Sequence, residues 1–507
     1  MNFGEMSAFI LYFVVVLLIG VVFFLRDRHD TSEAGYFLGG RKMGAWVTAL
    51  SAQASDMSGW LLMGFPGSIF AFGMGKVWIG IGLAIGTIAN WLIVARRLRR
   101  FSKAAGDSIT LPQYLTNRFA TKNPALKIIC AVIFLVSFTV YVASAFVAGR
   151  TVLCSLVPWF ADGHETVALF VFAAIILCYT FLGGFNAVCW TDFFQGLLML
   201  GAVISVPIIM LVSGQFDASY SGAFRDGITA FGTNPFAVSW QDIVTGLGWG
   251  LGYFGMPHII VRFMSIEKPS MIKKSATVAI VWVVLSLGAA MAIAILGRTY
   301  LLKGGQSLAE LLLPDDRNSI FISIVQDAFP GFIAGLMLAA IIAASMSTAD
   351  SQLLVASSSF TSDIYKPLLR KGKASDKEIA LVGRIVVVAV SVVAFFIANS
   401  GGEWAGDIMA MVENAWGLFG SAFGPVIILS LFWKRLNYAG AVAGIVCGAV
   451  VDGLWLAFLT GSSGIYEIVP GFIAGMAAAV IVTLCTRAPG AEVERIFAAA
   501  TDNCVDD

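Results

Sequence analysis

Long apolar segments follow one another along almost the whole chain, and short polar stretches separate them. Because roughly 20 apolar residues cross a bilayer as a helix, the pattern predicts about thirteen membrane spans. The spans are expected near 6–26, 43–72, 77–96, 125–149, 165–184, 188–213, 238–262, 275–301, 320–355, 380–399, 405–433, 438–460 and 469–486. The longest polar stretches, 102–122, 214–234 and 366–377, are loop-sized. We therefore expect an all-α integral membrane protein with a single transmembrane domain over residues 1–507.

The second span contains a polar patch, Ala54–Trp60, which reads Ala-Ser-Asp-Met-Ser-Gly-Trp between apolar flanks. Hydrocarbon cannot solvate a charge or a broken backbone, so such a patch must face protein, water or a ligand. An ionisable residue at this depth, here Asp56, is by default a candidate for a functional site. A second polar patch, residues 344–351, repeats the signal far downstream and points to an ion-coupled transporter.

The seventh span contains a glycine-rich stretch, residues 246–257, whose last residue is Pro257. Glycine costs about 1 kcal/mol and proline about 3 kcal/mol inside a helix, so we expect this span to be unwound near its centre. Interrupted helices in corresponding positions indicate an inverted-repeat transporter with its site at the midplane of the membrane. The expected repeats are 43–213 and 238–433, with additional helices at 6–26, 438–460 and 469–486.

Composition excludes several other classes of protein. The chain is 58% hydrophobic and 12% charged, whereas a soluble domain is about 25% charged. A formal net charge of +1 gives no basic field for nucleic acid, so no nucleic-acid partner is expected. The apolar composition predicts that membrane lipid surrounds the protein. The seven cysteines form no CxxC pair and therefore predict neither a disulfide framework nor a metal site. Residues 250–255 match the GxGxxG pattern of dinucleotide-binding proteins, but no strand precedes them, so we reject this motif. No motif for ATP-driven transport or hydrolysis occurs, so neither an enzyme nor an organic cofactor is expected.

The basic residues predict how the chain is oriented in the membrane. Glu5 precedes the first span and Arg26 ends it, which places the N-terminus outside and predicts a retained span instead of a cleaved signal peptide. Later basic clusters all fall after odd-numbered spans, which puts them and the C-terminus in the cytoplasm. These clusters are 96–100, 268–274, 366–373 and 434–435.

Ser347 and Thr348 share one helix face with the carbonyl of Ala344, at spacings of three and four residues. If the second span unwinds, the carbonyls of Ala54 and Met57 lose their helical partners and can turn toward the same point. Neutral oxygen ligands suit a hard monovalent cation that must be released in each cycle. The alternative is that the two hydroxyls bond their own helix or allow close packing; the interrupted second span favours the cation site.

Asp56 could ligate the cation, relay a proton or cap the second half of its span, and we place capping or shaping of the site slightly ahead of direct ligation. Trp60, Trp249 and Tyr253 lie beside the helix breaks and could wall a pocket for a small solute. Trp249 and Tyr253 are four residues apart, which favours a shared wall. Half-helix N-termini carry partial positive charge and suit a carboxylate on that solute. The alternative is interfacial packing of aromatic residues against lipid.

At these positions the chain resembles the sodium/solute symporter family, and within it the bacterial proline carriers. Four segments carry the resemblance in order along the chain: 36–41, 54–60, 248–258 and 344–354. It implies a leucine-transporter-type core with discontinuous helices, located in the bacterial cytoplasmic membrane. It also implies a sodium site at Ala54, Met57, Ala344, Ser347 and Thr348. The substrate pocket it implies consists of Ser58, Trp60, Tyr141, Trp249, Tyr253 and Pro257.

The expected function is sodium-coupled import of L-proline by alternating access. One departure bears on the substrate, because Met256 stands where the proline-carrier pattern has glutamine, and this removes a hydrogen-bond donor and acceptor. Asp192 lies where some relatives carry an acid linked to cation coupling and is a secondary candidate. The alternatives are a symporter for another small amino acid or a carboxylate, a membrane sensor, or a membrane enzyme. A monomer is compatible with the sequence.

Overall fold

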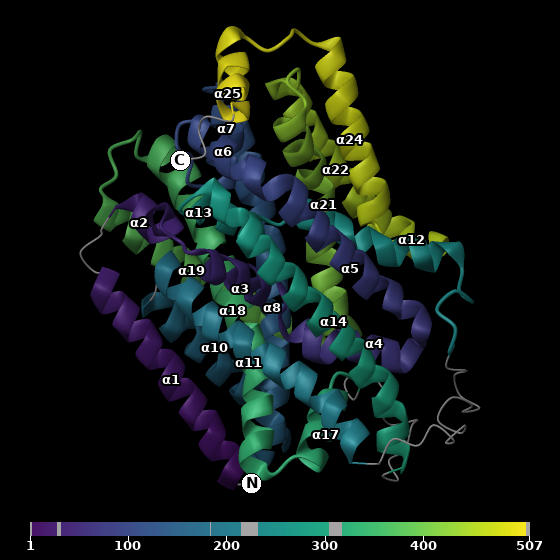
Figure 1. The fold of residues 1–507 in the computed structure, drawn as a ribbon. Helices are drawn as coiled ribbons and strands as arrows, with labels where there is room; N and C mark the ends of the chain where they lie inside the picture. The colour runs from purple at the N-terminus through teal and green to yellow at the C-terminus, as the bar shows by residue number, and fades with distance from the viewer. Residues whose placement is uncertain (1–2, 28–31, 183, 214–231, 304–316, 503–507) are drawn as a thin grey trace.

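The computed structural model describes residues 3–27, 32–182, 184–213, 232–303 and 317–502. In these residues the chain is helical throughout, and its one β-type pairing is an isolated bridge between Met43 and Ile266. Figure 1 shows the helices packed into a single bundle, with the start of α1 and the helix α25 at opposite ends. The all-α prediction is confirmed.

Ten helical segments of the described chain are long and apolar enough to cross a membrane. They contain α1 Phe3–Asp27, α5 Val77–Ala89 with α6 Arg96–Ala104, α8 Ala125–Leu156, α11 Phe185–Val212, α14 Ile272–Lys303, α18 Gly331–Phe360, α19 Asp376–Ala398, α21 Ile408–Phe432, α22 Tyr438–Phe458 and α24 Ile468–Cys485. Three more predicted spans correspond to α10, Glu165–Leu182, and to two interrupted helices. Shorter helices complete the chain: α2 Glu33–Leu38, α7 Leu111–Arg118, α9 Pro158–Ala161, α17 Ile320–Ala328, α20 Glu403–Gly406, α23 Thr460–Ser463 and α25 Ala491–Thr501.

The second span is interrupted where the polar patch predicts it. Helix α3, Ala45–Asp56, ends at Met57, whose backbone leaves the helical region with φ −85° and ψ 82°. The chain resumes as a wide turn, Trp60–Gly64, and continues as α4, Phe65–Phe72. The last carbonyls of α3 are therefore without partners inside their own helix.

The seventh span is interrupted in the same manner. Helix α12, Trp240–Gly248, tightens into a 3₁₀ segment, Trp249–Phe254, and α13, Pro257–Ser265, starts afresh. Met256 has ψ 107° at the junction, and Pro257 takes the first turn of α13, where the missing N–H costs nothing. The predicted break is confirmed.

Two of the expected segments are wrong. The span expected at 320–355 is two helices, because Pro330 has an extended ψ of 144° between α17 and α18 and cannot continue the helix. The polar stretch 102–122 contains α7, which is capped by the Thr110 hydroxyl. Helix α25 follows the last span, in the tail after residue 487. The expected loop 214–234 lies largely outside the described residues.

Helix α18 runs through the centre of the bundle and packs against α8, α1, α11, α19 and α3. Its middle, which includes the polar patch 344–351, is completely buried. The predominance of alanine and serine here keeps the side chains small, so neighbouring backbones can approach closely. This central position brings the downstream patch against the broken end of α3.

Candidate cation and solute site

The two polar patches meet at the carbonyl oxygen of Ala54. The Ser347 hydroxyl donates to this oxygen at 2.8 Å and the Thr348 hydroxyl at 3.4 Å. Ser347 Oγ also lies 3.1 Å from the Ala344 carbonyl oxygen. The Ala54 carbonyl, which α3 leaves without a helical partner, is therefore hydrogen-bonded to α18, the helix that carries the second polar patch.

The predicted cation residues are all fully buried: Ala54, Met57, Ala344, Ser347 and Thr348. Four of them are joined by the hydrogen bonds above, and Met57 is the first non-helical residue after α3. A hydroxyl has two lone pairs and a rotatable hydrogen, so Ser347 and Thr348 can turn their lone pairs toward a cation. The Ser347 and Thr348 hydroxyls meet at the Ala54 carbonyl oxygen, and the five predicted residues include no carboxylate.

Asp56 connects the two interrupted helices. Its Oδ2 accepts a hydrogen bond of 2.6 Å from the Tyr253 hydroxyl, while its Oδ1 has no hydrogen-bond partner among the described residues. The interpretation of Asp56 as an N-cap is wrong, because the residue ends α3 and the next helical segment has no side-chain cap. The unwound turn directs the carboxylate across to the seventh span instead.

The Asp56 carbonyl gathers three further donors at the break. It accepts from Ser58 N at 3.1 Å, from Trp60 Nε1 at 3.2 Å and from the Tyr141 hydroxyl at 3.4 Å. Three of the predicted solute residues therefore surround one backbone group.

The aromatic residues of the seventh span face different neighbours. Trp249 lies 5.2 Å from Tyr466 by ring centroids, and Tyr253 lies 5.0 Å from Trp416. The expected shared wall assumes α-helical spacing, but this segment is 3₁₀, with 3.0 residues per turn, so residues four apart do not share a face.

Trp416 of α21 is a member of the site that the sequence does not reveal. Its indole Nε1 donates to the Trp249 carbonyl at 2.8 Å while its ring meets Tyr253 edge-on. A Cβ on Gly252 would lie 1.9 Å from the same nitrogen, so only glycine lets the indole approach. The chain has 13 tryptophans, so the sequence does not distinguish Trp416 from those that pack against lipid.

The predicted solute residues are all buried in this structure. Trp60, Tyr141, Trp249 and Tyr253 are each at most 1% exposed, and Ser58, Met256 and Pro257 are also buried. A solute can therefore reach these side chains only when the surrounding helices move.

Asp192 of α11 belongs to a second buried polar cluster. Its Oδ2 accepts from Ser51 Oγ at 2.7 Å and from Arg262 Nη2 at 3.1 Å. Arg262 also donates to the Ser351 hydroxyl and lies 1% exposed. A charged side chain inside the membrane is costly, so the pairing of Arg262 with Asp192 is what permits its burial.

This cluster adjoins the cation residues along two helices. Ser51 precedes Ala54 by one helical turn on α3, and Ser351 follows Ser347 by one turn on α18. Arg262 is absent from our sequence-based predictions, although a lone arginine within an apolar span is the signal that would have identified it.

Comparison with known proteins shows which family the chain belongs to. The model of the sodium:solute symporter family matches residues 36–448. A sodium/proline symporter of Staphylococcus aureus is 41% identical over 495 residues, which is 95% of this chain and 93% of the relative.

Solved structures share the fold. A substrate-bound, outward-open Na⁺-coupled sialic acid symporter aligns with a TM-score of 0.76 at 22% identity, over 96% of this chain and 98% of that one. MhsT in complex with L-phenylalanine aligns with a TM-score of 0.52 at 15% identity, over 86% and 97%. The fold class predicted from the interrupted helices is thereby confirmed, and the chain belongs to the sodium:solute symporter family.

Proposed function

We propose that this multi-pass membrane protein is a secondary active symporter that couples sodium entry to the import of L-proline. The observation that carries the proposal is the meeting of the two half-sites, in which Ser347 and Thr348 of α18 bond the Ala54 carbonyl of α3. The identity of 41% to a sodium/proline symporter supports the choice of solute.

Sodium is the co-transported ion and would take the place of the hydroxyl protons at the Ala54 carbonyl. Its ligands would be the carbonyl oxygens of Ala54, Met57 and Ala344 with the hydroxyls of Ser347 and Thr348. Because these atoms come from two helices, the ion ties α3 to α18 and selects one conformation. All the ligands are neutral, so the ion can leave once that conformation changes.

Proline would bind at the two helix breaks, with Trp60 and Tyr141 beside the first break and Trp249, Tyr253 and Pro257 at the second, where Trp249 and Tyr253 face different neighbours. Aromatic faces suit its pyrrolidine ring, and its carboxylate suits the backbone amides of the half-helices, with Ser58 beside them. Asp56 and Met256 shape this pocket, and Asp192 with Arg262 links it to the cation ligands. Because these residues are buried, transport would proceed by alternating access. In the proposed orientation, the N-terminus lies outside and the C-terminus lies in the cytoplasm.

Uptake of labelled proline into proteoliposomes tests the proposal. An inward sodium gradient is expected to drive accumulation, and replacing sodium by choline is expected to abolish it. Unchanged uptake in choline would contradict the coupling.

Met256 favours a second candidate, a sodium-coupled symporter for another small amino acid or a carboxylate. A thioether next to Pro257 offers no amide to a polar solute. A competitor panel in the same vesicles separates the two functions, because proline outcompetes the other solutes only if it is the substrate.

A further inference from the structure

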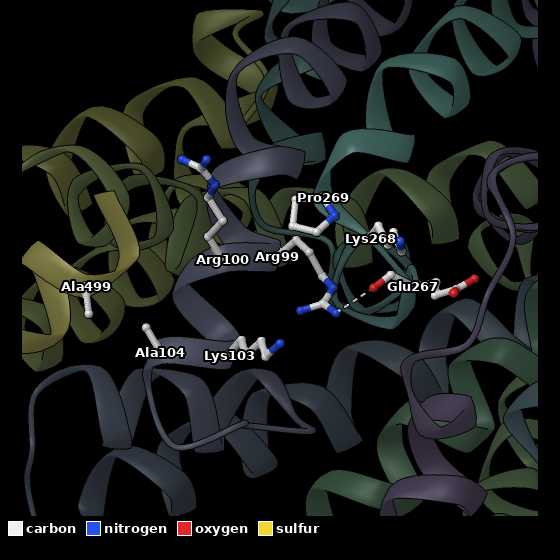
Figure 2. Close-up of a pocket in the computed structure, with 8 residues that line it drawn as sticks. All are labelled: Arg99, Arg100, Lys103, Ala104, Glu267, Lys268, Pro269 and Ala499. Atoms are coloured by element: carbon white, nitrogen blue, oxygen red, sulfur yellow. Dashed lines mark hydrogen bonds between the residues drawn. The ribbon is translucent and has the colours of Figure 1, made fainter. Parts of the chain in front are cut away.

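A basic hollow lies away from the transport site, where two membrane spans end. It is lined by residues of α6, of the loop before α14 and of α25 (Figure 2): Arg99, Arg100, Lys103, Ala104, Glu267, Lys268, Pro269 and Ala499. Its volume is about 180 Å³, on a scale where one water molecule needs about 10–15 Å³. The hollow is thus large enough for a ligand group.

Arg99 is the buried charge of this hollow. Its side chain is 3% exposed, with Nε donating to the Ile266 carbonyl at 2.7 Å and Nη2 to the Glu267 carbonyl at 3.0 Å. Its third nitrogen, Nη1, is buried and has no hydrogen-bond partner among the described residues. A buried guanidinium nitrogen without an acceptor is costly, and an anion in the hollow would supply one.

Positive charges outnumber carboxylates around Arg99, because the Asp107 carboxylate nearby is paired with Arg41 at 2.7 Å. Lys103 follows Arg99 by four residues, so the two cations share one face of α6 and repel each other. Figure 2 shows both on the same side of the helix, while the Glu267 carboxylate points away from Arg99. Lys268 adds a further ammonium group to the lining. An anion between these groups would relieve the repulsion.

The hollow lies at the level expected for lipid phosphates. The segment that ends beside it, Met74–Ala104, has 31 residues and is therefore about 46 Å long, whereas the hydrocarbon core is about 30 Å thick. Its basic end thus extends into the head-group region. The other wall begins at Pro269, the first residue of the span Pro269–Leu301. Basic pockets between spans at this depth suit phospholipid head groups.

We propose that this hollow binds a phosphate-bearing anion, with Arg99 Nη1, Lys103 and Lys268 as its ligands. The chemistry is that of charge-assisted hydrogen bonds to phosphate oxygens. Two sources share this chemistry, the head group of an anionic phospholipid and free phosphate. Arg99 also fastens the loop at residues 266–267, so the lysines are the appropriate residues to vary.

Native mass spectrometry of the full-length protein in detergent tests the proposal with phosphatidylglycerol and phosphatidylcholine as probes. The wild type is expected to retain phosphatidylglycerol in preference to phosphatidylcholine. The double variant K103Q/K268Q is expected to bind phosphatidylglycerol about 30-fold more weakly, since each lysine near a membrane surface contributes about fivefold. K273Q/K274Q removes an equal charge from exposed positions outside the hollow and is expected to bind like the wild type.

Competition with inorganic phosphate distinguishes the two sources. Displacement of the lipid by phosphate identifies a site for soluble phosphate groups, whereas resistance to displacement identifies a site that also requires the lipid chains; each result supports the anion site. Equal retention of the two lipids by the wild type would overturn the proposal. An equal loss in K273Q/K274Q and K103Q/K268Q would also overturn it, because general surface charge would then account for the binding. Thermal unfolding of the double variant near the wild-type temperature verifies that it is folded.

Discussion

At the scale of single residues, the hydroxyl of Thr348 is expected to act on sodium affinity and not on folding. Thr348→Ala removes one neutral oxygen from the proposed cation site while Ser347 still holds the Ala54 carbonyl. One lost ligand of about 1–1.5 kcal/mol corresponds to a roughly tenfold higher sodium concentration for half-maximal proline uptake. Uptake as a function of sodium in proteoliposomes measures this shift.

The matched control is Thr277→Ala, which makes the same change at an exposed position of α14. Thr277 Oγ1 bonds only the carbonyl of its own helix at Lys273. Thr348→Ser keeps the oxygen and is expected to stay near the wild type. A sodium dependence of Thr348→Ala identical to that of Thr277→Ala would return Thr348 to a packing role.

A second prediction concerns the hydrogen bond between Tyr253 and Asp56, which spans 2.6 Å in a fully buried setting. Tyr253→Phe leaves the carboxylate without its donor, a change that costs about 1–3 kcal/mol. We expect a lower unfolding temperature and reduced proline uptake. In an Asp56→Asn background the same substitution is expected to have a much smaller effect, because the charged acceptor is already gone. Additive losses in the double-mutant cycle would show that the two side chains act independently.

At the scale of helices, the seventh span is positioned by glycines that let it approach α5. A Cβ on Gly86 would lie 2.3 Å from the carbonyl oxygen of Gly250, within the 3₁₀ segment. Gly86→Ala is therefore expected to displace this segment and destabilise the protein by about 1–3 kcal/mol, with loss of uptake. Gly201→Ala in α11 meets nothing within 4 Å and serves as the control. Thermal unfolding and uptake of the two variants, measured side by side, test the prediction; equal behaviour would contradict it.

The sequence predicts where the helices break but not how the broken ends face each other. Glycine, proline and buried polar residues mark the breaks at 57 and 256 because their backbone preferences are local. The cation ligands follow from helical spacing within α18, which is also local. The Asp56–Tyr253 pair and the contact of Trp416 with the break in the seventh span depend on packing between distant helices, for which residue type alone gives no register. The 3₁₀ geometry at 249–254 likewise arises from close packing against α5 and α21.

At the scale of the whole molecule, coupling requires each ligand to strengthen the binding of the other. The cation residues join α3 to α18, and the solute residues join the same break in the second span to the seventh span. In the proposed arrangement one break serves both sites, so sodium that fixes it would also prepare the solute pocket. Linkage then demands that sodium raise proline affinity by the same factor by which proline raises sodium affinity, which is about 5–150-fold for coupling energies of 1–3 kcal/mol.

This reciprocity can be measured on the purified protein without transport. Proline binding at several sodium concentrations gives one factor, and sodium binding at several proline concentrations gives the other. Arg262→Gln should reduce both factors equally, because it disconnects the Asp192 cluster from Ser51 and Ser351, which lie one turn from the cation ligands. If Arg262→Gln leaves both factors unchanged, the Asp192 cluster has only a structural role. Proline affinity that does not respond to sodium in the wild type would contradict the shared break itself, since two sites built on one hinge cannot be energetically independent.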